Sequence, residues 1–485
     1  MPLILGTNSI KDTGFNVANS LRFNKGSSDY LSKNTATATN AKKFTYSVWV
    51  KRGVLNPTDD STAQRLYQGY ADTNNRLYIQ FNYSAEVIRI FGKTGGTTEI
   101  YWDSTKKFRD VSAWYHIVMS ADSTLSTQAD RMKVYVNNEL IDSWSKTNSP
   151  SQNIDWGNQI AQSNGTLTIG ADNTTSELFD GYMAEACFID GQALDPTSFG
   201  EFDEDSGIWK PINVSGLTFG TNGFYLDFEN SGSLGADVSG NGNNFTVNNL
   251  TSIDQTTDTP TLNYATGNPL NIPTSNQPTF SNGNNTIAIG NSRVGLSSTI
   301  GMTQGKWYAE FKFTSAVNVN TPTVGISGEP AKLCIDNAFA GLSASNGVSI
   351  TADGYLYDDG SSTYPSTWSS TFGLDDIVGV AIDLDNNYVY FSINGTWQNS
   401  GDPTSGASGT GGLSLTNVSS VLEGAYFFTP GNASSANPCT WNANFGNPPF
   451  SISSGNSDGN GMGNFEYSVP SGYYALNSKN LAEFG

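Results

Sequence analysis

Charged residues are scarce in this 485-residue chain. Asp, Glu, Lys and Arg make up 14% of it, against about 25% in an average soluble protein. Basic residues are the scarcer kind, with 24 Lys and Arg against 44 Asp and Glu, so the formal net charge is −20. Proteins that bind nucleic acid draw their affinity from basic side chains. We therefore expect no nucleic-acid partner.

Cysteine and long apolar runs are also scarce. The three cysteines, Cys187, Cys334 and Cys439, lie far apart and form no CxxC motif, so we interpret them as buried thiols rather than a disulfide framework. No window approaches the ~18 continuous apolar residues of a membrane span, and no membrane insertion is expected. The N-terminus has no basic segment and no small-residue cleavage site, so no signal peptide is predicted.

Helix periodicity and heptad repeats are absent, whereas turn formers abound, with 51 Gly in the chain. Aromatic residues reach 12%, which is not the composition of a disordered chain. Short alternating runs of apolar and polar residues, separated by Gly, Asn and Asp clusters, predict the strands of a sandwich. The predicted fold class is all-β, with two antiparallel β-sandwich (jelly-roll) domains. Fewer than about one residue in ten should be helical.

The strand-like runs fall into two blocks. The clearest runs of the first block are Phe44–Val50, Arg76–Phe81, Trp114–Met119 and Gly181–Ile189. Those of the second block are Lys306–Phe313, Asp376–Leu384, Tyr388–Ile393, Leu422–Phe428 and Thr440–Phe445. Asn137-Asn138 and Asn394-Gly395 are hairpin signals, because Asn and Gly tolerate a positive φ.

These blocks divide the chain into five parts. An N-terminal tail of residues 1–16 precedes a first jelly roll at 17–211. Residues 212–300 are rich in Gly, Asn and Pro, and we expect an irregular linker there, or an extension that leans on a neighbouring domain. The second sandwich covers 301–450, and residues 451–485 are expected to form a C-terminal tail.

Motifs in both blocks resemble known families. The first block resembles the laminin-G/concanavalin-A-like jelly roll through Phe44–Val50, Trp114–Val118, Val134–Asn137, Ile169-Gly170, Phe179–Glu185 and Leu194–Pro196. The second block is similar to a SPRY domain, itself a bent β-sandwich. That likeness is carried by Gly305–Glu310, Val378–Asp383, Val389–Gly395 and Asn444–Gly446.

The pairing of these two modules around Asp237–Phe245 resembles structural proteins of marine tailed phages, which are placed on tail fibres or other virion appendages. The resemblance implies a virion protein made in the host cytoplasm, with other virion structural proteins as partners and a homotrimer as one arrangement. It also implies a non-enzymatic adhesin that binds a host cell-surface glycan or protein. A structural spacer or capsid-decoration protein that binds only virion proteins is the alternative, and a jelly-roll glycan hydrolase is the third.

One stretch rich in aromatic and acidic residues is predicted to form a ligand-binding loop. Its residues are Tyr355, Tyr357, Asp358, Asp359, Tyr364 and Trp368. Exposed aromatic faces stack on sugar rings or receive peptide side chains, and neighbouring carboxylates orient hydroxyls or cations. The variable loops of SPRY domains form their ligand surface, which favours this interpretation. Against it, large aromatic residues of all-β proteins lie mostly in the core.

No catalytic residue is predicted. His116 is the only histidine, and we expect it to occupy a structural strand position rather than to act as a general base. The acidic stretch Glu201–Asp205 approaches the Glu-x-Asp-x-x-Glu motif of jelly-roll glucanases, but the last acid of that motif would fall at Ser206. We therefore expect a solvated loop there.

No cofactor is predicted, and calcium is the one alternative left open. Asp383–Asn387 begins like a calcium loop but lacks the loop Gly and the distal Glu, so we expect a hairpin turn. Asp172–Glu177 is a similar loop, where the fold analogy alone allows calcium. No metal-ligating residue is assigned.

Overall fold

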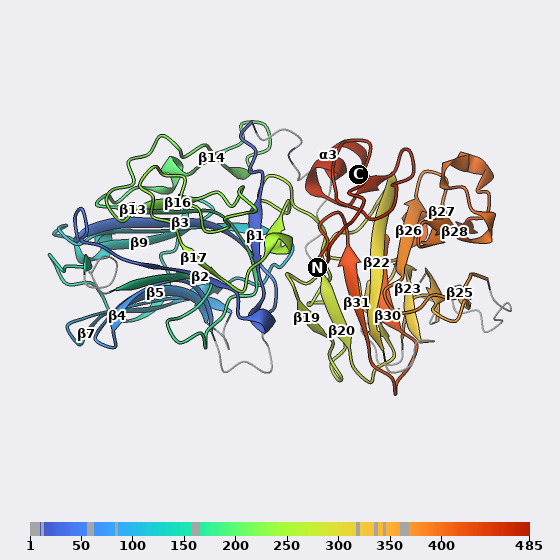
Figure 1. Ribbon diagram of the computed structural model, residues 1–485, viewed down its shortest axis with the longest axis horizontal. Coiled ribbons are helices and arrows are strands. Elements are labelled where there is room, and N and C mark those ends of the chain that lie inside the picture. Colours follow the sequence, from blue (N-terminus) through green and yellow to red (C-terminus); the bar gives the residue numbers. More distant parts are fainter. Residues whose placement is uncertain are drawn as a thin grey trace. The chain divides into compact units, whose positions relative to one another are not determined.

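The computed structural model of the chain describes residues 10, 14–55, 63–82, 86–157, 165–316, 321–333, 338–342, 346–358 and 368–485. The chain divides into two compact units, Thr13–Thr261 and Leu262–Gly485 (Figure 1). Strands hold 41% of the residues and helices 8%, which confirms the all-β prediction. The α-helices of the described residues are α2 (Pro330–Leu333) and α3 (Ser478–Phe484). No described helix has both the length and the apolar character needed to cross a membrane.

Two antiparallel sheets face each other in the N-terminal unit. The first has the strand order β10 (Glu139–Leu140), β9 (Met132–Val136), β8 (Trp114–Asp122), β3 (Lys43–Arg52), β13 (Gly181–Asp190), β1 (Ser20–Phe23) and β18 (Gln255–Thr256), and β16 (Phe224–Leu226) pairs with β13. The second has the order β11 (Trp144–Asn148), β7 (Thr97–Lys107), β6 (Val87–Thr94), β5 (Asn75–Asn82), β4 (Gln64–Asp72), β12 (Thr166–Ile169), β2 (Tyr30–Asn34) and β17 (Thr246–Asn248).

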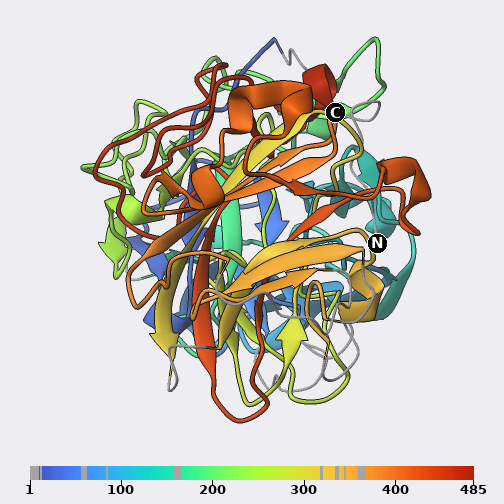
Figure 2. The same cartoon turned by 90° about the vertical axis from the view of Figure 1, so that its right-hand side faces the viewer.

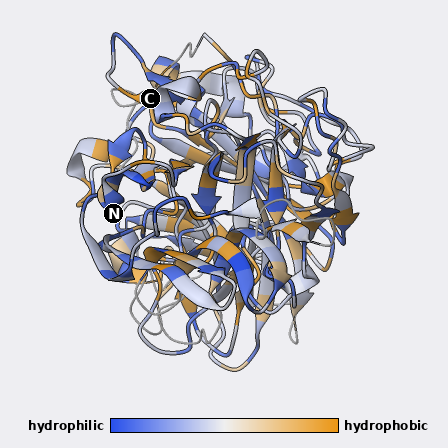
Figure 3. Cartoon of the chain, turned by 90° about the vertical axis from the view of Figure 1, so that its left-hand side faces the viewer, coloured by the Kyte–Doolittle hydropathy of each residue, from blue (hydrophilic) through white to orange (hydrophobic). Residues whose placement is uncertain are grey.

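The alternation of side chains along β3 shows how this unit buries its residues. Tyr46, Val48 and Val50 point into the core between the two sheets. Trp49 and Lys51 point to the other face of the sheet, because successive strand residues alternate. Both remain buried there, so a further layer of chain covers this outer face. Figure 3 shows hydrophobic and hydrophilic residues interspersed along the strands of this unit.

The covering layer comes from the chain after β13. It begins with the hairpin of β14 (Gly200–Phe202) and β15 (Trp209–Pro211) and continues to Thr261. Three short strands of this layer join the two main sheets: β16 pairs with β13, β17 with β2 and β18 with β1. The Lys51 Nζ lies 2.7 Å from the Asp258 Oδ2, and both side chains are fully buried. Residues 212–261 therefore extend the N-terminal sandwich.

The C-terminal unit is also built from two sheets. The larger has the order β19 (Thr279–Ser281), β20 (Thr286–Ile289), β31 (Cys439–Asn444), β22 (Lys306–Ala316), β26 (Ile377–Asp383), β27 (Tyr388–Ile393) and β28 (Thr396–Trp397); β29 (Leu413–Ser414) pairs with β27, and β32 (Tyr474–Ala475) with β22. The smaller has the order β21 (Val294–Gly295), β30 (Phe427–Asn432), β23 (Pro322–Ser327), β24 (Gly347–Thr351) and β25 (Leu356–Asp358) (Figure 2).

Segments expected to be linker and tail contribute to this unit. Residues 262–300 supply β19, β20 and β21. The C-terminal segment covers the outer face of the larger sheet, where Phe465 and Tyr473 pack with Tyr308 and Tyr390 in one buried cluster. β32 of the same segment pairs in parallel with β22. The segment after 450 thus completes the core of the unit.

Local turn signals were mostly reliable. Asn137 and Asn138 have φ values of 50° and 67°, and Asn394 and Gly395 have 48° and 78°, which confirms both hairpin predictions. The predicted strand Leu422–Phe428 is wrong over most of its length, since β30 begins only at Phe427. Leu422 is 76% exposed, and Gly424 adopts a φ of 64° in a turn.

Candidate ligand-binding site

The predicted loop lies at the edge of the smaller sheet of the C-terminal unit. Tyr357 and Asp358 belong to β25, the last strand of that sheet, and Tyr355 directly precedes it. Trp368 lies beyond the loop, and Asp359 and Tyr364 fall outside the described residues. The structure therefore places four of the six predicted residues.

A glycine turn brings the two ends of the loop together. The backbone N–H of Trp368 donates to the carbonyl of Gly354 over 2.8 Å, and that of Ser369 donates to the same oxygen over 3.2 Å. Gly354 has a φ of 87°, and a Cβ at this position would lie 2.6 Å from the carbonyl oxygen of Ser369. The close approach requires glycine. It holds the backbone of Trp368 beside that of Tyr355.

The four described residues differ in exposure. Tyr355 is 39% exposed, and Asp358 is exposed too. Tyr357 is half-buried, because its ring packs edge-on against Phe339 with 4.8 Å between ring centroids. Trp368 is also half-buried and meets the buried Phe391 edge-on at 6.0 Å. A ligand could therefore contact Tyr355 and Asp358 without disturbing the packing of the half-buried Tyr357 and Trp368.

Asp358 also lines a small pocket of about 50 Å³. Another part of its wall comes from elsewhere in the sequence, from Asn346, Ser414, Thr416 and Tyr426. The Tyr426 hydroxyl donates to the carbonyl of Thr416 over 2.8 Å, which fixes that wall. These four residues escaped the sequence analysis because no local motif links them.

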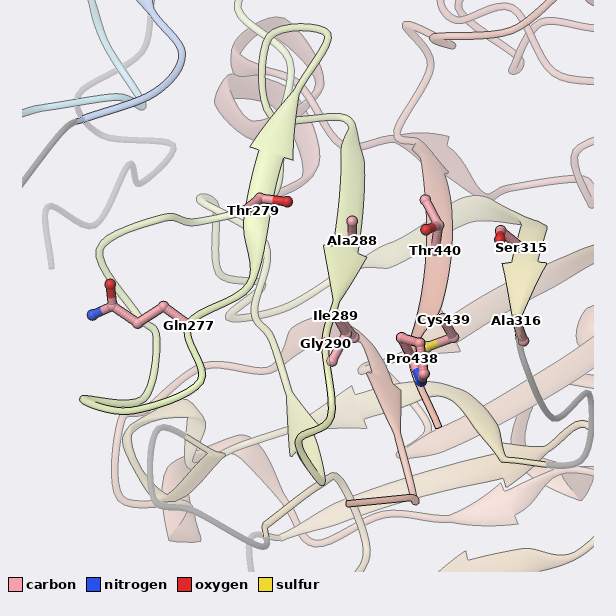
Figure 4. A pocket seen from close by; sticks show the side chains of 10 residues that line it. All are labelled: Gln277, Thr279, Ala288, Ile289, Gly290, Ser315, Ala316, Pro438, Cys439 and Thr440. Carbon is pink, nitrogen blue, oxygen red and sulfur yellow. The ribbon is translucent and has the colours of Figure 1, made fainter. Parts of the chain in front are cut away.

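A shallow groove of about 330 Å³ lies elsewhere on this unit, across β19, β20, β31 and β22 (Figure 4). Its walls carry small side chains, among them Thr279, Ala288, Ser315 and Thr440. None of the residues that line it is charged. We assign no ligand to this groove, since small uncharged side chains offer little to recognise.

His116 is held in a structural role. It is fully buried, and its ring stacks on Trp49 at 4.6 Å. The Trp209 Nε1 donates to its Nδ1 over 2.9 Å, so the proton lies on the Nε2, which donates to the Ser47 Oγ over 2.8 Å. Burial lowers the pKa of His116 to about 3. A neutral ring with both nitrogens bonded is not available as a general base.

The acidic stretch that resembles a glucanase motif lies on an exposed hairpin. Glu201 is on β14, and Asp203 begins the turn to β15. The Lys210 Nζ lies 3.5 Å from the Glu201 Oε1 and 3.2 Å from the Asp203 Oδ2. The stretch is exposed, as expected from the sequence, but its first part, Glu201 and Phe202, lies on a strand rather than in a loop.

The two loops considered for calcium use their carboxylates internally. The buried Asp383 pairs with the Lys306 Nζ at 2.8 Å and accepts a hydrogen bond from the backbone N–H of Asn386 in the β26–β27 hairpin. Asp172 accepts hydrogen bonds from the backbone N–H groups of Ser176 and Glu177. Within the described ranges, no group of three or more His, Cys, Asp or Glu side chains is placed to hold a metal ion.

Two of the three cysteines can be placed. Cys187 and Cys439 are buried free thiols, as predicted, and burial raises the pKa of Cys439 to about 12. Cys334 falls outside the described residues. A thiol with so high a pKa is unreactive at neutral pH.

Comparison with known proteins agrees with the N-terminal sandwich. Residues 25–197 match the family model of the concanavalin A-like lectin/glucanases superfamily, which confirms the laminin-G/concanavalin-A-like part of the sequence analysis. The match covers part of the chain only. No curated protein matches the chain.

Several solved structures are similar to parts of the chain. The SPRY domain of human HERC1 is 17% identical, with 36% of this chain and 96% of that chain covered and a TM-score of 0.27. A putative carbohydrate binding protein from Bacteroides ovatus is 15% identical, with 48% and 59% covered and a TM-score of 0.33. The SAP-like pentraxin from Limulus polyphemus is 14% identical, with 37% and 80% covered and a TM-score of 0.26.

Proposed function

We propose that this chain is a non-catalytic adhesin of a phage virion, carried on a tail fibre or another appendage, that binds a glycan or protein on the host cell surface. The observation that carries the binding role is the pair of exposed side chains, Tyr355 and Asp358, at β25. There Tyr355 is 39% exposed beside the exposed Asp358. Half-buried aromatic rings on either side of the loop hold this edge in place.

An exposed aromatic ring beside a carboxylate suits a sugar or a polar peptide. The ring packs against apolar C–H groups, and the carboxylate accepts hydrogen bonds from hydroxyl or amide groups. The charge of the chain favours the same partners, because a net charge of −20 repels polyanions. It also keeps the protein soluble at neutral pH.

The non-catalytic part of the proposal rests on how the candidate catalytic groups are used. His116 is enclosed by Trp49 and Trp209 with both ring nitrogens bonded. Asp203 pairs with Lys210 on an exposed turn. Release of reducing ends from host polysaccharide by the purified chain would contradict this part of the proposal.

The virion assignment rests on the likeness of the two modules around Asp237–Phe245 to phage structural proteins. Its test is labelling of intact particles with gold-tagged antibody against this chain. We expect label on a tail appendage. Label on the capsid would favour a decoration protein instead.

The binding role is tested with the full chain on a glycan array and on whole host cells. Tyr355→Ala should weaken attachment, since loss of one stacked ring removes ~1–3 kcal/mol from a contact, with base stacking as the guide. Its melting temperature should not change, because the ring is exposed. Glu423→Gln, at an exposed position elsewhere in the unit, is the control. Full attachment by Tyr355→Ala would remove β25 from the binding surface.

A further inference from the structure

A further cavity of the C-terminal unit, of about 390 Å³, is formed where three distant segments meet. These are the start of β22, the turn between β26 and β27, and the C-terminal segment. Its walls include Gln304, Lys306, Asp385, Tyr474 and Phe484. The volume is in the range of pockets that bind small molecules, about 300–1,000 Å³.

The aromatic wall of this cavity is preorganised. The rings of Tyr474 and Phe484 lie parallel, with 3.7 Å between centroids and 8° between planes. Tyr474 is held by the pairing of β32 with β22, and Phe484 ends α3. Because the stack already exists, a ligand would spend little free energy in ordering it.

Polar groups stand beside the aromatic wall. The Asp385 Oδ1 accepts a hydrogen bond from the backbone N–H of Gly305 over 3.1 Å, which orients the carboxylate. Among the described residues, neither the other oxygen of Asp385 nor the Tyr474 hydroxyl has a hydrogen-bond partner. The Gln304 Nε2 donates to the carbonyl of Gly485 over 2.8 Å.

The charge of the cavity excludes anionic ligands. The Lys306 Nζ is 2.8 Å from the buried Asp383 carboxylate, so its charge is balanced inside the protein. Asp385 then leaves the cavity with a negative charge. A carboxylated, sulfated or phosphorylated ligand would be repelled.

We propose that this cavity binds a neutral pyranose sugar residue. The apolar C–H face of the sugar would pack on the aromatic wall, and its hydroxyls would bond to Asp385 and Tyr474. This inference rests on the proposed function, because it locates a glycan-binding site on the same unit. It does not depend on the edge at β25.

The test is titration of the full chain with the methyl glycosides of glucose, galactose, mannose and N-acetylglucosamine, followed by saturation-transfer NMR and calorimetry. Tyr474→Phe keeps the stack on Phe484 and removes the hydroxyl. Asp385→Asn keeps an acceptor for the N–H of Gly305 and removes the charge. We expect at least one glycoside to bind and the double variant to lose at least tenfold in affinity.

The matched control is the double variant Tyr70→Phe with Glu423→Gln, which makes the same chemical changes outside the cavity and away from β25. It should bind the glycoside like the wild type, and both double variants should melt at the wild-type temperature. Unchanged glycoside affinity in the cavity variant would overturn this inference, while attachment to host cells would still uphold the proposed function. Failure to bind any of the four glycosides would overturn the inference as well. A chain that binds neither cells nor any array glycan would overturn both.

Discussion

Glu310, buried in the C-terminal unit, should make that unit less stable as the pH rises. Its side chain is fully buried on β22. It accepts hydrogen bonds from the backbone N–H groups of Glu466 (2.9 Å) and Tyr467 (2.8 Å), and from Tyr308 and Asn444 (3.2 Å each). Burial opposes ionisation more strongly than these donors favour it, and it raises the pKa of Glu310 to about 7.

The expected magnitude follows from proton linkage. In the unfolded chain the pKa of a glutamate is about 4.3, so between pH 5 and pH 7 the folded unit binds a proton that the unfolded chain has lost. Stability is then fully present at low pH and falls by about 1.4 kcal/mol per pH unit until Glu310 ionises near pH 7. The total loss between pH 5 and pH 8 is about 3 kcal/mol.

The change Glu310→Gln removes this titration and keeps the shape of the side chain. We expect the stability of the variant to stay constant between pH 5 and pH 8, so that its stability relative to the wild type rises by about 3 kcal/mol over this range. Calorimetry at several pH values measures this on the transition of the C-terminal unit. Glu423→Gln, an exposed glutamate, should follow the wild type throughout.

A difference in stability between Glu310→Gln and the wild type that stays constant from pH 5 to pH 8 would contradict this prediction. Each carboxylate oxygen faces one backbone N–H, so the amide of glutamine leaves one of them without an acceptor whichever way it turns. That loss is worth ~1–3 kcal/mol at every pH, so only the change of the difference with pH reports on Glu310. A constant difference would mean that the hydrogen bonds outweigh desolvation and keep Glu310 ionised.

Three further predictions concern the N-terminal unit. His116→Ala should cost ~3 kcal/mol in urea unfolding at neutral pH, since it leaves a cavity and an unpaired Trp209 Nε1. The pKa of His116 is about 3 in the folded protein and about 6.5 in the unfolded chain, so the wild type should lose stability as the pH falls below 6.5. If the stability of His116→Ala falls with pH as steeply as that of the wild type, the burial of His116 is contradicted. Lys33→Met should raise the melting temperature, because the buried Lys33 Nζ has no hydrogen-bond partner among the described residues and burial lowers its pKa to about 8. A lower melting temperature of the variant would show that the protein stabilises the ammonium group at this position. A fragment of residues 14–261 should unfold cooperatively in calorimetry, whereas a fragment of residues 14–211 should not. The shorter fragment lacks β16, β17, β18 and Asp258, the partner of Lys51. Equally cooperative unfolding of both fragments would show that the N-terminal unit folds without residues 212–261.

Only part of the candidate site could be predicted from the local sequence. Tyr355 and Asp358 could be singled out from the sequence because aromatic and acidic residues gather in one stretch. The half-burial of Tyr357 and Trp368 could not, since it depends on Phe339 and Phe391 from other parts of the chain. Of the residues Gln304, Asp385, Tyr474 and Phe484 that line the cavity, the sequence singled out Asp385 alone, and only as part of a hairpin turn.

The fold divides in the same way between local and long-range causes. Alternating apolar and polar residues determined the strands, and pairs such as Asn394-Gly395 determined the hairpins, because both depend on neighbours within a few residues. Only the tertiary structure decided what covers the outer faces of the sheets. In the C-terminal unit Glu310 accepts hydrogen bonds from Glu466 and Tyr467, more than 150 residues away. In the N-terminal unit Lys51 pairs with Asp258 across more than 200 residues. Irregular segments rich in Gly, Asn and Ser look like linkers in sequence, because their few apolar residues have no period. They are held by individual contacts with a surface that exists only once the sheets have formed.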